Sequence, residues 1–411
     1  MLDQFYRRRK VLQRLRSGPL GPHMDDVAAQ LLEMGFASHD SGQRQFRLLH
    51  KLNRWLEARG LGVAALDEKT IHEFLDQLQQ GFWLRDAKAG WRLLLKQLRD
   101  RGIVPLPQGE MDETPCCRLQ REFARYLVEQ RGLAPKSVQL YLAQTQAFLN
   151  ERFGPGPLAL SELTARDVTQ FVLRRCRPNG RGDFALAPAL RNFFRFLRLR
   201  GDLAIDLAGA VPAAARWRLS GLPKSLPAQQ VELVLAGCDR NSPMGRRDYA
   251  VLLVLARLGL RAGEIAAMRL EDLDWRAAEL TVRGKGSRQD RLPILQDVGE
   301  ALTAYLCDGR PRCSSRHVFV RARAPYREFG DASSVITIVE RAIERVGLNP
   351  PVKGAHLLRH SLACEMLRRH ASLGEIGQIL RHRLPSATEI YAKVDLEALR
   401  TVAQPWPGAR P

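Results

Sequence analysis

The chain has 411 residues, of which 45% are hydrophobic, so it is long enough for two or three domains with buried cores. Sixty-four Lys and Arg against 44 Asp and Glu give a net charge of +20, which favours a polyanionic partner, nucleic acid before an anionic membrane surface. No apolar run approaches the roughly 20 residues of a membrane span, and the N-terminus lacks the apolar core of a signal peptide, so we expect a cytoplasmic protein. The seven cysteines are scattered, so we expect reduced thiols, no zinc site and no disulfide framework.

Two proline-marked segments divide the chain. Residues 102–115 (GIVPLPQGEMDETP) and 211–227 (VPAAARWRLSGLPKSLP) are typical of linkers, because Pro removes an amide donor and disfavours helix in the residue before it. We therefore predict an N-terminal helical domain over 1–106, a second helical domain over 113–212 and a C-terminal domain over 224–411.

The first two predicted domains follow one plan of amphipathic helices. A constant offset of 97 residues aligns Gly35 with Gly132, Leu52 with Leu149, Leu66 with Leu163, Ile71 with Val168 and Phe74 with Phe171. In each domain the last predicted helix is rich in arginine and ends at a glycine, Gly102 and Gly201. The arginines could contact DNA phosphates or could be an ordinary solvated face.

The C-terminal domain has a mixed pattern. We predict two helices over 247–275 separated near Gly259, a β-hairpin over 278–295, and helices over 332–348, from His356, over 373–383 and from Ser386. Ser386 and Glu389 have the spacing of a capping box at the start of that last helix.

Polar side chains stand where these elements begin, turn or end: Arg261, Lys285, His356, Arg359, His382 and Tyr391. Any one of them has a plain structural explanation, such as a solvated turn for Lys285 or a half-buried core position for Tyr391. The helix start HLLRH is harder to explain, because positive charge there opposes the helix dipole. A bound anion would resolve that conflict.

In this order, the segments LGLRAGEI, RGKGSRQDRLPI, HLLRHS and ILRHRLPSATEIYAKV resemble the tyrosine recombinase (phage integrase) family. The resemblance covers roughly residues 224–400, and the helical domain before them resembles the core-binding domain of the family. It implies a mainly α fold with a small β-hairpin or sheet, in which two helical core-binding-like domains precede a mixed α/β catalytic domain.

The resemblance implies a site-specific recombinase that cleaves and rejoins DNA through a 3′-phosphotyrosyl link, with no metal and no cofactor. The catalytic residues would be Arg261, Lys285, His356, Arg359, His382 and the nucleophile Tyr391. Guanidinium forks suit the phosphate oxygens, histidines could add donors or move protons, and the hairpin lysine could protonate the leaving 5′ oxygen. Glu264 would support Arg261.

The expected partners are double-stranded DNA and other copies of the chain in a synaptic tetramer, with no membrane. Residues 395–403 could form a short helix that docks on a neighbouring subunit. Arg381 and Arg383 replace the Gly and the small Ser that flank the second histidine in the family pattern. These arginines put the geometry of that loop in question and could add phosphate contacts.

The extra N-terminal domain allows two interpretations: it extends the DNA footprint, which its arginines favour, or it contacts protein in the synapse. It also favours a mobile-element recombinase over a chromosome-dimer resolvase. Three other hypotheses for the whole chain are a catalytically idle DNA-binding relative, a type IB topoisomerase-like enzyme and a basic RNA-binding or scaffold protein.

Overall fold

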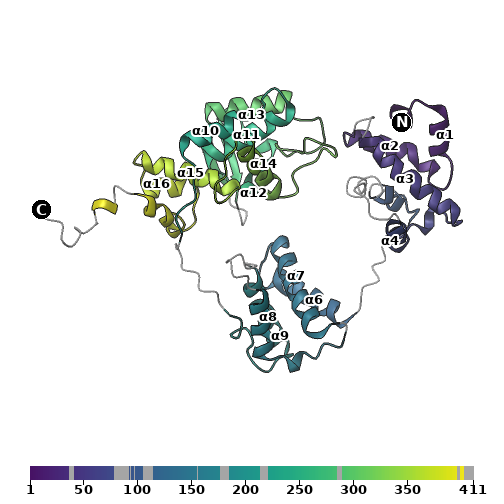
Figure 1. The fold of residues 1–411 in the computed structure, drawn as a ribbon, viewed down its shortest axis with the longest axis horizontal. Helices are drawn as coiled ribbons and strands as arrows, with labels where there is room; N and C mark the ends of the chain where they lie inside the picture. Colours follow the sequence, from purple (N-terminus) through teal and green to yellow (C-terminus); the bar gives the residue numbers. More distant parts are fainter. Residues whose placement is uncertain are drawn as a thin grey trace. The chain divides into compact units, whose positions relative to one another are not determined.

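The computed structural model describes residues 1–36, 41–77, 92, 94–96, 98–104, 114–154, 156–175, 185–212, 221–284, 289–395 and 399–401, without the side chains of 68, 69 and 72. The fold is mainly helical with one three-stranded antiparallel sheet, which confirms the predicted fold class (Figure 1). One compact unit is Pro107–Arg218, and a second is made of Met1–Leu106 and Leu219–Pro411.

The N-terminal helices surround a core of Phe and Leu side chains. They are α1 (Arg9–Arg16), α2 (Met24–Glu33), α3 (Ser41–Ala58) and α4 (Glu68–Gln77), with a 3₁₀ turn η3 (Val63–Ala65) before α4. The buried Asn53 of α3 accepts a hydrogen bond from Leu20 N–H and donates one to the carbonyl of Ser17, both at 2.7 Å. This amide therefore ties α3 to the segment that follows α1.

The second set of helices is α6 (Pro115–Glu129), α7 (Pro135–Phe153), α8 (Ala165–Arg175) and α9 (Leu186–Arg200), with η4 (Leu160–Glu162) before α8. Its core is aromatic. Phe123 and Phe193 meet edge to face at 5.1 Å, and Phe148 and Phe171 do the same. Helix α9 ends at Gly201, which takes the left-handed conformation that favours glycine.

The two sets share the predicted offset of 97 residues. It carries η3 onto η4 and the start of α4 onto the start of α8. Aligned apolar residues are buried in both cores, as Leu52 and Leu149 illustrate. The repetition therefore extends from the sequence pattern to the elements and to the packing.

The C-terminal helices are α10 (Ala228–Ala236), α11 (Pro243–Leu258), α12 (Ala262–Ala267), α13 (Gln296–Asp308), α14 (Ala332–Arg345), α15 (Ala355–Arg368) and α16 (Leu373–Ile379). The strands are β1 (Leu273–Asp274), β2 (Glu279–Arg283) and β3 (Gln289–Pro293), in the order β1-β2-β3, with Leu280 opposite Leu292.

Helix α11 is the centre of this core. Ser242 caps it by accepting from Gly245 N–H at 3.1 Å, Pro243 occupies the first turn, and Gly259 ends it in the left-handed region at φ 58°. Residues 250–256 are all buried. The predicted break near Gly259 is thus present, and the chain turns there into α12.

The predicted helix from Ser386 is wrong. Two short 3₁₀ segments occupy that stretch, η6 (Pro385–Ala387) and η7 (Glu389–Val394). Thr388, between them, is buried and its hydroxyl is hydrogen-bonded to His382. Tyr391, which belongs to η7, is buried as well. These anchors require a tighter path than an α-helix. The capping box forms instead at Ser372 and Glu375, at the start of α16.

Some predictions lie outside the described residues. They include the hairpin tip with Lys285, and most of the tail helix expected over 395–403, of which residues 399–401 are described as helical. Within the described part of the chain, no helix is both long and apolar enough to cross a bilayer.

Gly259→Ala should destabilise the C-terminal domain more than Gly347→Ala. Both glycines have positive φ, which costs a side chain about 1–2 kcal/mol. A Cβ at Gly259 would lie 2.6 Å from Leu380 Cδ2, whereas one at Gly347 meets no atom within 4 Å. We expect a loss of about 2–3 kcal/mol for Gly259→Ala in urea unfolding. Equal losses would mean that the core around Leu380 adjusts freely.

Candidate active site

Arg359 lies at the centre of the candidate site. It projects from the first turns of α15 and is 3% exposed. Its two terminal nitrogens donate to the carbonyls of Gly259, at the end of α11, and Leu380, just after α16. Burial lowers the pKa of this guanidinium to about 10, with help from the nearby cations Arg261 and Arg381.

Arg261 lies at the start of α12, where it is bonded to Glu264. The backbone N–H of Arg261 donates to Oε2 of Glu264 at 2.8 Å, and its guanidinium donates to Oε1 at 2.7 Å. Glu264 is 7% exposed at its side chain, whereas the side chain of Arg261 is exposed. The carboxylate therefore binds both the backbone and the side chain of Arg261, whose guanidinium stays exposed.

Glu264 also binds a second arginine. Arg381 Nη2 donates to its Oε2 at 2.8 Å, and the side chain of Arg381 is 6% exposed. Burial alone would raise the pKa of Glu264, but the amide of Arg261 and the two guanidinium groups bring it below its ordinary value. The carboxylate is ionised at neutral pH.

Tyr391 is buried, with 1% exposure, against Ala363, Cys364 and Leu380. Its hydroxyl lies 2.8 Å from Nδ1 of His360. Its ring is parallel to that of His382, with 6.4 Å between the centroids. Burial raises the pKa of the phenol to about 12, against the opposing effect of Arg359.

The histidines around Tyr391 are neutral at pH 7. Burial and the neighbouring positive groups lower the pKa of His360 and of His382 to about 4 each. Nδ1 of His360 can therefore accept the phenol proton in a hydrogen bond, and His382 shares a 2.7 Å hydrogen bond with Thr388. His356 lies on the first turn of α15 with part of its surface in solvent. Its pKa is lowered by loss of hydration on its protein-facing side, and by the charges of Arg359 and Arg261.

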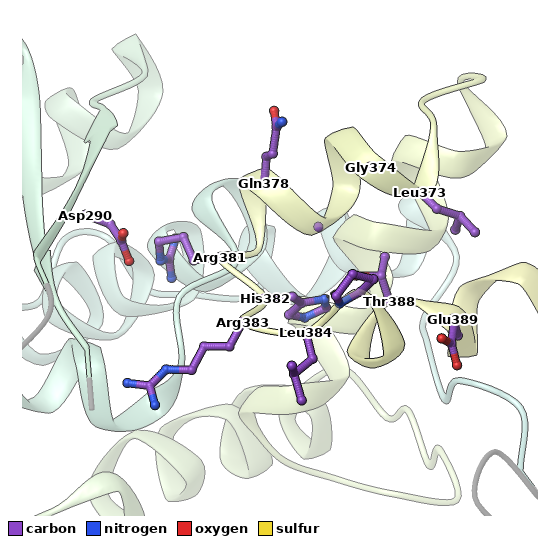
Figure 2. Close-up of a pocket in the computed structure, with 12 residues that line it drawn as sticks. Asp290, Leu373, Gly374, Gln378, Arg381, His382, Arg383, Leu384, Thr388 and Glu389 are labelled. Carbon is purple, nitrogen blue, oxygen red and sulfur yellow. Dashed lines mark hydrogen bonds between the residues drawn. The ribbon is translucent and has the colours of Figure 1, made fainter. Parts of the chain in front are cut away.

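Two cavities open beside this cluster. One, of about 570 Å³, is lined by His382, Thr388, Arg381 and Arg383 among others (Figure 2). The other, of about 540 Å³, is lined by Arg261, Glu264, Arg283 and Gly284, and shares Asp290, Arg381 and Arg383 with the first. In Figure 2, Arg381 lies toward Asp290 and His382 toward Thr388. Tyr391 lines neither of these cavities.

The structure thus brings together the predicted residues Arg261, Glu264, His356, Arg359, His382 and Tyr391, while Lys285 lies outside the described residues. Two side chains at the site received no such role from the sequence. His360 is part of the same HLLRHS segment, and its place directly after Arg359 was the available signal. The sequence indicates Arg381 as a departure from the family pattern that could add a phosphate contact, but gives no sign of its bond to Glu264.

Metal ligands do not gather at this site. Over the residues that the structure describes, no group of three or more His, Cys, Asp or Glu side chains could hold a metal ion. The charge that faces an anion here comes from guanidinium groups.

The sequence is similar to those of known proteins. Residues 224–397 match the phage integrase family. A putative integrase/recombinase of Sinorhizobium fredii, y4rA, is 41% identical over 402 residues, which cover 97% of each chain. The tyrosine recombinase XerD of Mycobacterium tuberculosis is 32% identical over 305 residues, covering 70% of this chain and 95% of XerD.

A solved structure has the same fold at low identity. A lambda integrase tetramer bound to a Holliday junction is similar with a TM-score of 0.52 and 16% identity, over 75% of this chain and 86% of that one.

Acidification from pH 6.5 to 5 should destabilise the C-terminal domain. His360 and His382 titrate near 4 when folded and near 6.5 when unfolded, so the unfolded chain binds more protons in this window. The loss grows as the pH falls toward 4, where both imidazoles must become charged in the folded chain. Glu264 stays ionised above pH 5 because its pKa is lowered.

Urea unfolding from pH 7 to pH 5 measures this loss. A double variant, His360→Gln with His382→Gln, should show a smaller loss of stability than the unmodified chain over the same range. Identical pH slopes for the two proteins would contradict the assignment of neutral histidines.

Proposed function

We propose that this chain, which belongs to the phage integrase family of tyrosine recombinases, cleaves and rejoins double-stranded DNA through a covalent bond between Tyr391 and a 3′-phosphate. The observation that carries the proposal is the convergence of Tyr391 with Arg359 and Arg261 at one site, although 130 residues separate Arg261 from Tyr391 along the chain.

The chemistry asks for stabilised negative charge on phosphorus. When the phenolic oxygen bonds to phosphorus, the non-bridging oxygens of the five-coordinate transition state gain charge. Arg261 is exposed and points a guanidinium at the adjoining cavity, and Arg359 keeps N–H donors beyond the two that bind carbonyls. Each positioned donor is typically worth about 3 kcal/mol in such a transition state. His356, at the exposed start of α15, adds another donor.

In this structure Tyr391 is a poor nucleophile, because its phenol is protonated and buried. Burial raises the pKa of the phenol to about 12 and lowers that of His360 to about 4, so the proton stays on the phenol. The phenol is also covered. We infer that DNA binding moves η7, which brings the hydroxyl to the phosphate and into the field of the arginines.

Proton supply to the leaving group is the role we propose for Lys285. As the bond from Tyr391 to phosphorus forms, the phenolic proton passes to a neighbouring histidine, the P–O5′ bond breaks, and the 5′ oxygen takes a proton from the lysine. Lys285 follows strand β2, which pairs with β3. Gly284, the last residue described before Lys285, lines the same cavity as Arg261. Guanidinium groups take the place of a metal. A 5′-hydroxyl of another strand can then reverse the step.

Two relatives match different shares of this chain. The y4rA relative matches 97% of this chain, whereas XerD matches 70%. We propose integration, excision or transposition of a mobile element as the task. We also propose that four copies assemble on DNA, as lambda integrase does in its tetramer bound to a Holliday junction. An idle DNA-binding relative would form no covalent adduct, and a topoisomerase-like enzyme would relax DNA without exchanging strands.

The N-terminal helices offer a DNA-binding face. Arg14 of α1 and Arg54 of α3 both lower the pKa of His50, after the larger effect of burial. Arg14 and Arg47 likewise act on Tyr6. Guanidinium groups from α1 and α3 therefore gather on one face, which we propose contacts the phosphates of the outer part of the site.

The covalent adduct is the direct test of the function. The unmodified protein, mixed with a duplex nicked near the cleavage point, should form a complex that survives a denaturing gel, in EDTA as well. Tyr391→Phe should bind the same DNA within about threefold and form no adduct, because it lacks the attacking oxygen. An adduct with Tyr391→Phe would remove this residue from its role. Strand exchange between two labelled duplexes separates a recombinase from a topoisomerase.

Removal of two positive charges from the N-terminal face, in the full chain, tests whether this face binds DNA. Arg14→Ala with Arg54→Ala should weaken binding to a long site about tenfold and lower the salt slope by about 2. The matched control, Arg59→Ala with Arg101→Ala, removes the same charge from arginines that are paired with Glu73 and Asp26. It should change affinity less. Equal affinities for both variants, with loss of the higher-order synapse, would favour the protein-contact interpretation.

A further inference from the structure

We propose that Arg381 is a positioning residue, which keeps Arg261 available to the scissile phosphate by sharing the carboxylate of Glu264. The proposal rests on the function proposed above. Arg381 itself needs no contact with the DNA.

The contacts form a continuous chain. Arg381 Nη2 donates to Oε2 of Glu264, the same oxygen that accepts from the backbone N–H of Arg261. The other oxygen, Oε1, accepts from the guanidinium of Arg261. Because the side chains of Glu264 and Arg381 are more than nine-tenths buried, solvent screens their interaction little.

Counting charges shows what Arg381 adds. A buried carboxylate with one arginine is a neutral pair, and such a pair attracts a phosphate weakly. With Arg381 the group of three carries a net positive charge, and the only exposed member of the group is Arg261. Arg381 thus prevents Glu264 from neutralising the cation that it orients.

The backbone shows that this arginine is kept at a cost. Arg381 N–H donates to Gln378 at 3.0 Å and His382 N–H to Gly377 at 2.9 Å, which is the Schellman pattern at the end of α16. Arg381 has φ 54°, in the position where helices usually place glycine. Glycine in the family pattern satisfies this turn without strain. A side chain here is therefore explained by what it binds and not by the turn.

A second feature places the guanidinium beside the cavity. Arg381 Nε is buried and has no hydrogen-bond partner among the described residues, while Nη1 donates to the carbonyl of Ile379 at 3.3 Å. Arg381 lines both basic cavities of the site (Figure 2). Its bond to Glu264 therefore lies at the wall of the region where Arg261 would meet the phosphate.

The experiment is single-turnover cleavage of the nicked duplex at saturating protein, with affinity measured separately. Arg381→Gly should cleave about 10- to 100-fold more slowly and bind DNA within about threefold of the unmodified protein. Arg381→Lys should recover part of the rate, because it keeps the charge with one donor. Arg381→Gln keeps a side chain at the positive φ but removes the charge, and it should cleave slowly.

A double-variant cycle with Arg261 separates positioning from direct contact. If Arg381 acts through Arg261, then Arg381→Gly should cause less than about a twofold further loss in the Arg261→Ala background. Full multiplication of the two losses would mean that Arg381 acts on the DNA itself and would overturn the proposal. So would an unchanged rate for Arg381→Gly and Arg381→Gln.

Backbone and folding effects have their own control. Ala278→Gly relieves a left-handed residue at φ 52° in the same domain without touching Glu264, and it should cleave at the unmodified rate. Arg381→Gly should melt within about 3 °C of the unmodified chain. If it melts lower, the rates of the Lys and Gln variants decide: equal rates would overturn the proposal. Failure of the unmodified chain to form any adduct would instead refute the proposed function.

Discussion

The buried guanidinium of Arg359 is the contact on which the rest of the site depends. Its two hydrogen bonds join α15 to the end of α11 and to the segment after α16, so the same side chain that would face a phosphate also fixes the turns carrying Arg261 and His382. A planar fork with five donors can do both, because carbonyl bonds use only part of it. The positions of the cations therefore depend on how α11, α15 and α16 pack.

The electrostatics of the site keep its histidines and its buried phenol in their neutral forms. Arginines concentrate positive charge, and this charge together with burial keeps His360 and His382 neutral. Burial outweighs the same cations at Tyr391, so the phenol stays protonated in its pocket. A phosphate supplies the negative charge that this cluster lacks. Reactivity would then depend on bound DNA, which guards against cleavage elsewhere.

Two features of the chain go beyond the family pattern that its sequence resembles. One is an additional set of helices whose elements repeat at the offset of 97 residues. The other is a single residue, Arg381, in a turn that glycine would fit without strain. The first adds a second helical core, and the second adds a positive charge beside Glu264.

The sequence by itself determined several helices of each domain, the break at Gly259 and the residue types of the site, because apolar periodicity, glycine turns and ordered motifs are local signals. It predicted neither α10 nor α13, and it extended the helix after Gly259 to residue 275, whereas α12 ends at Ala267. It failed at Ser386, where a capping pattern lost to the anchoring of Thr388 and Tyr391. Only the tertiary structure decided that Tyr391 is buried against His360 and that Arg381 shares Glu264 with Arg261. Those contacts join residues 31 and 117 positions apart, and no local propensity encodes a pairing across such distances.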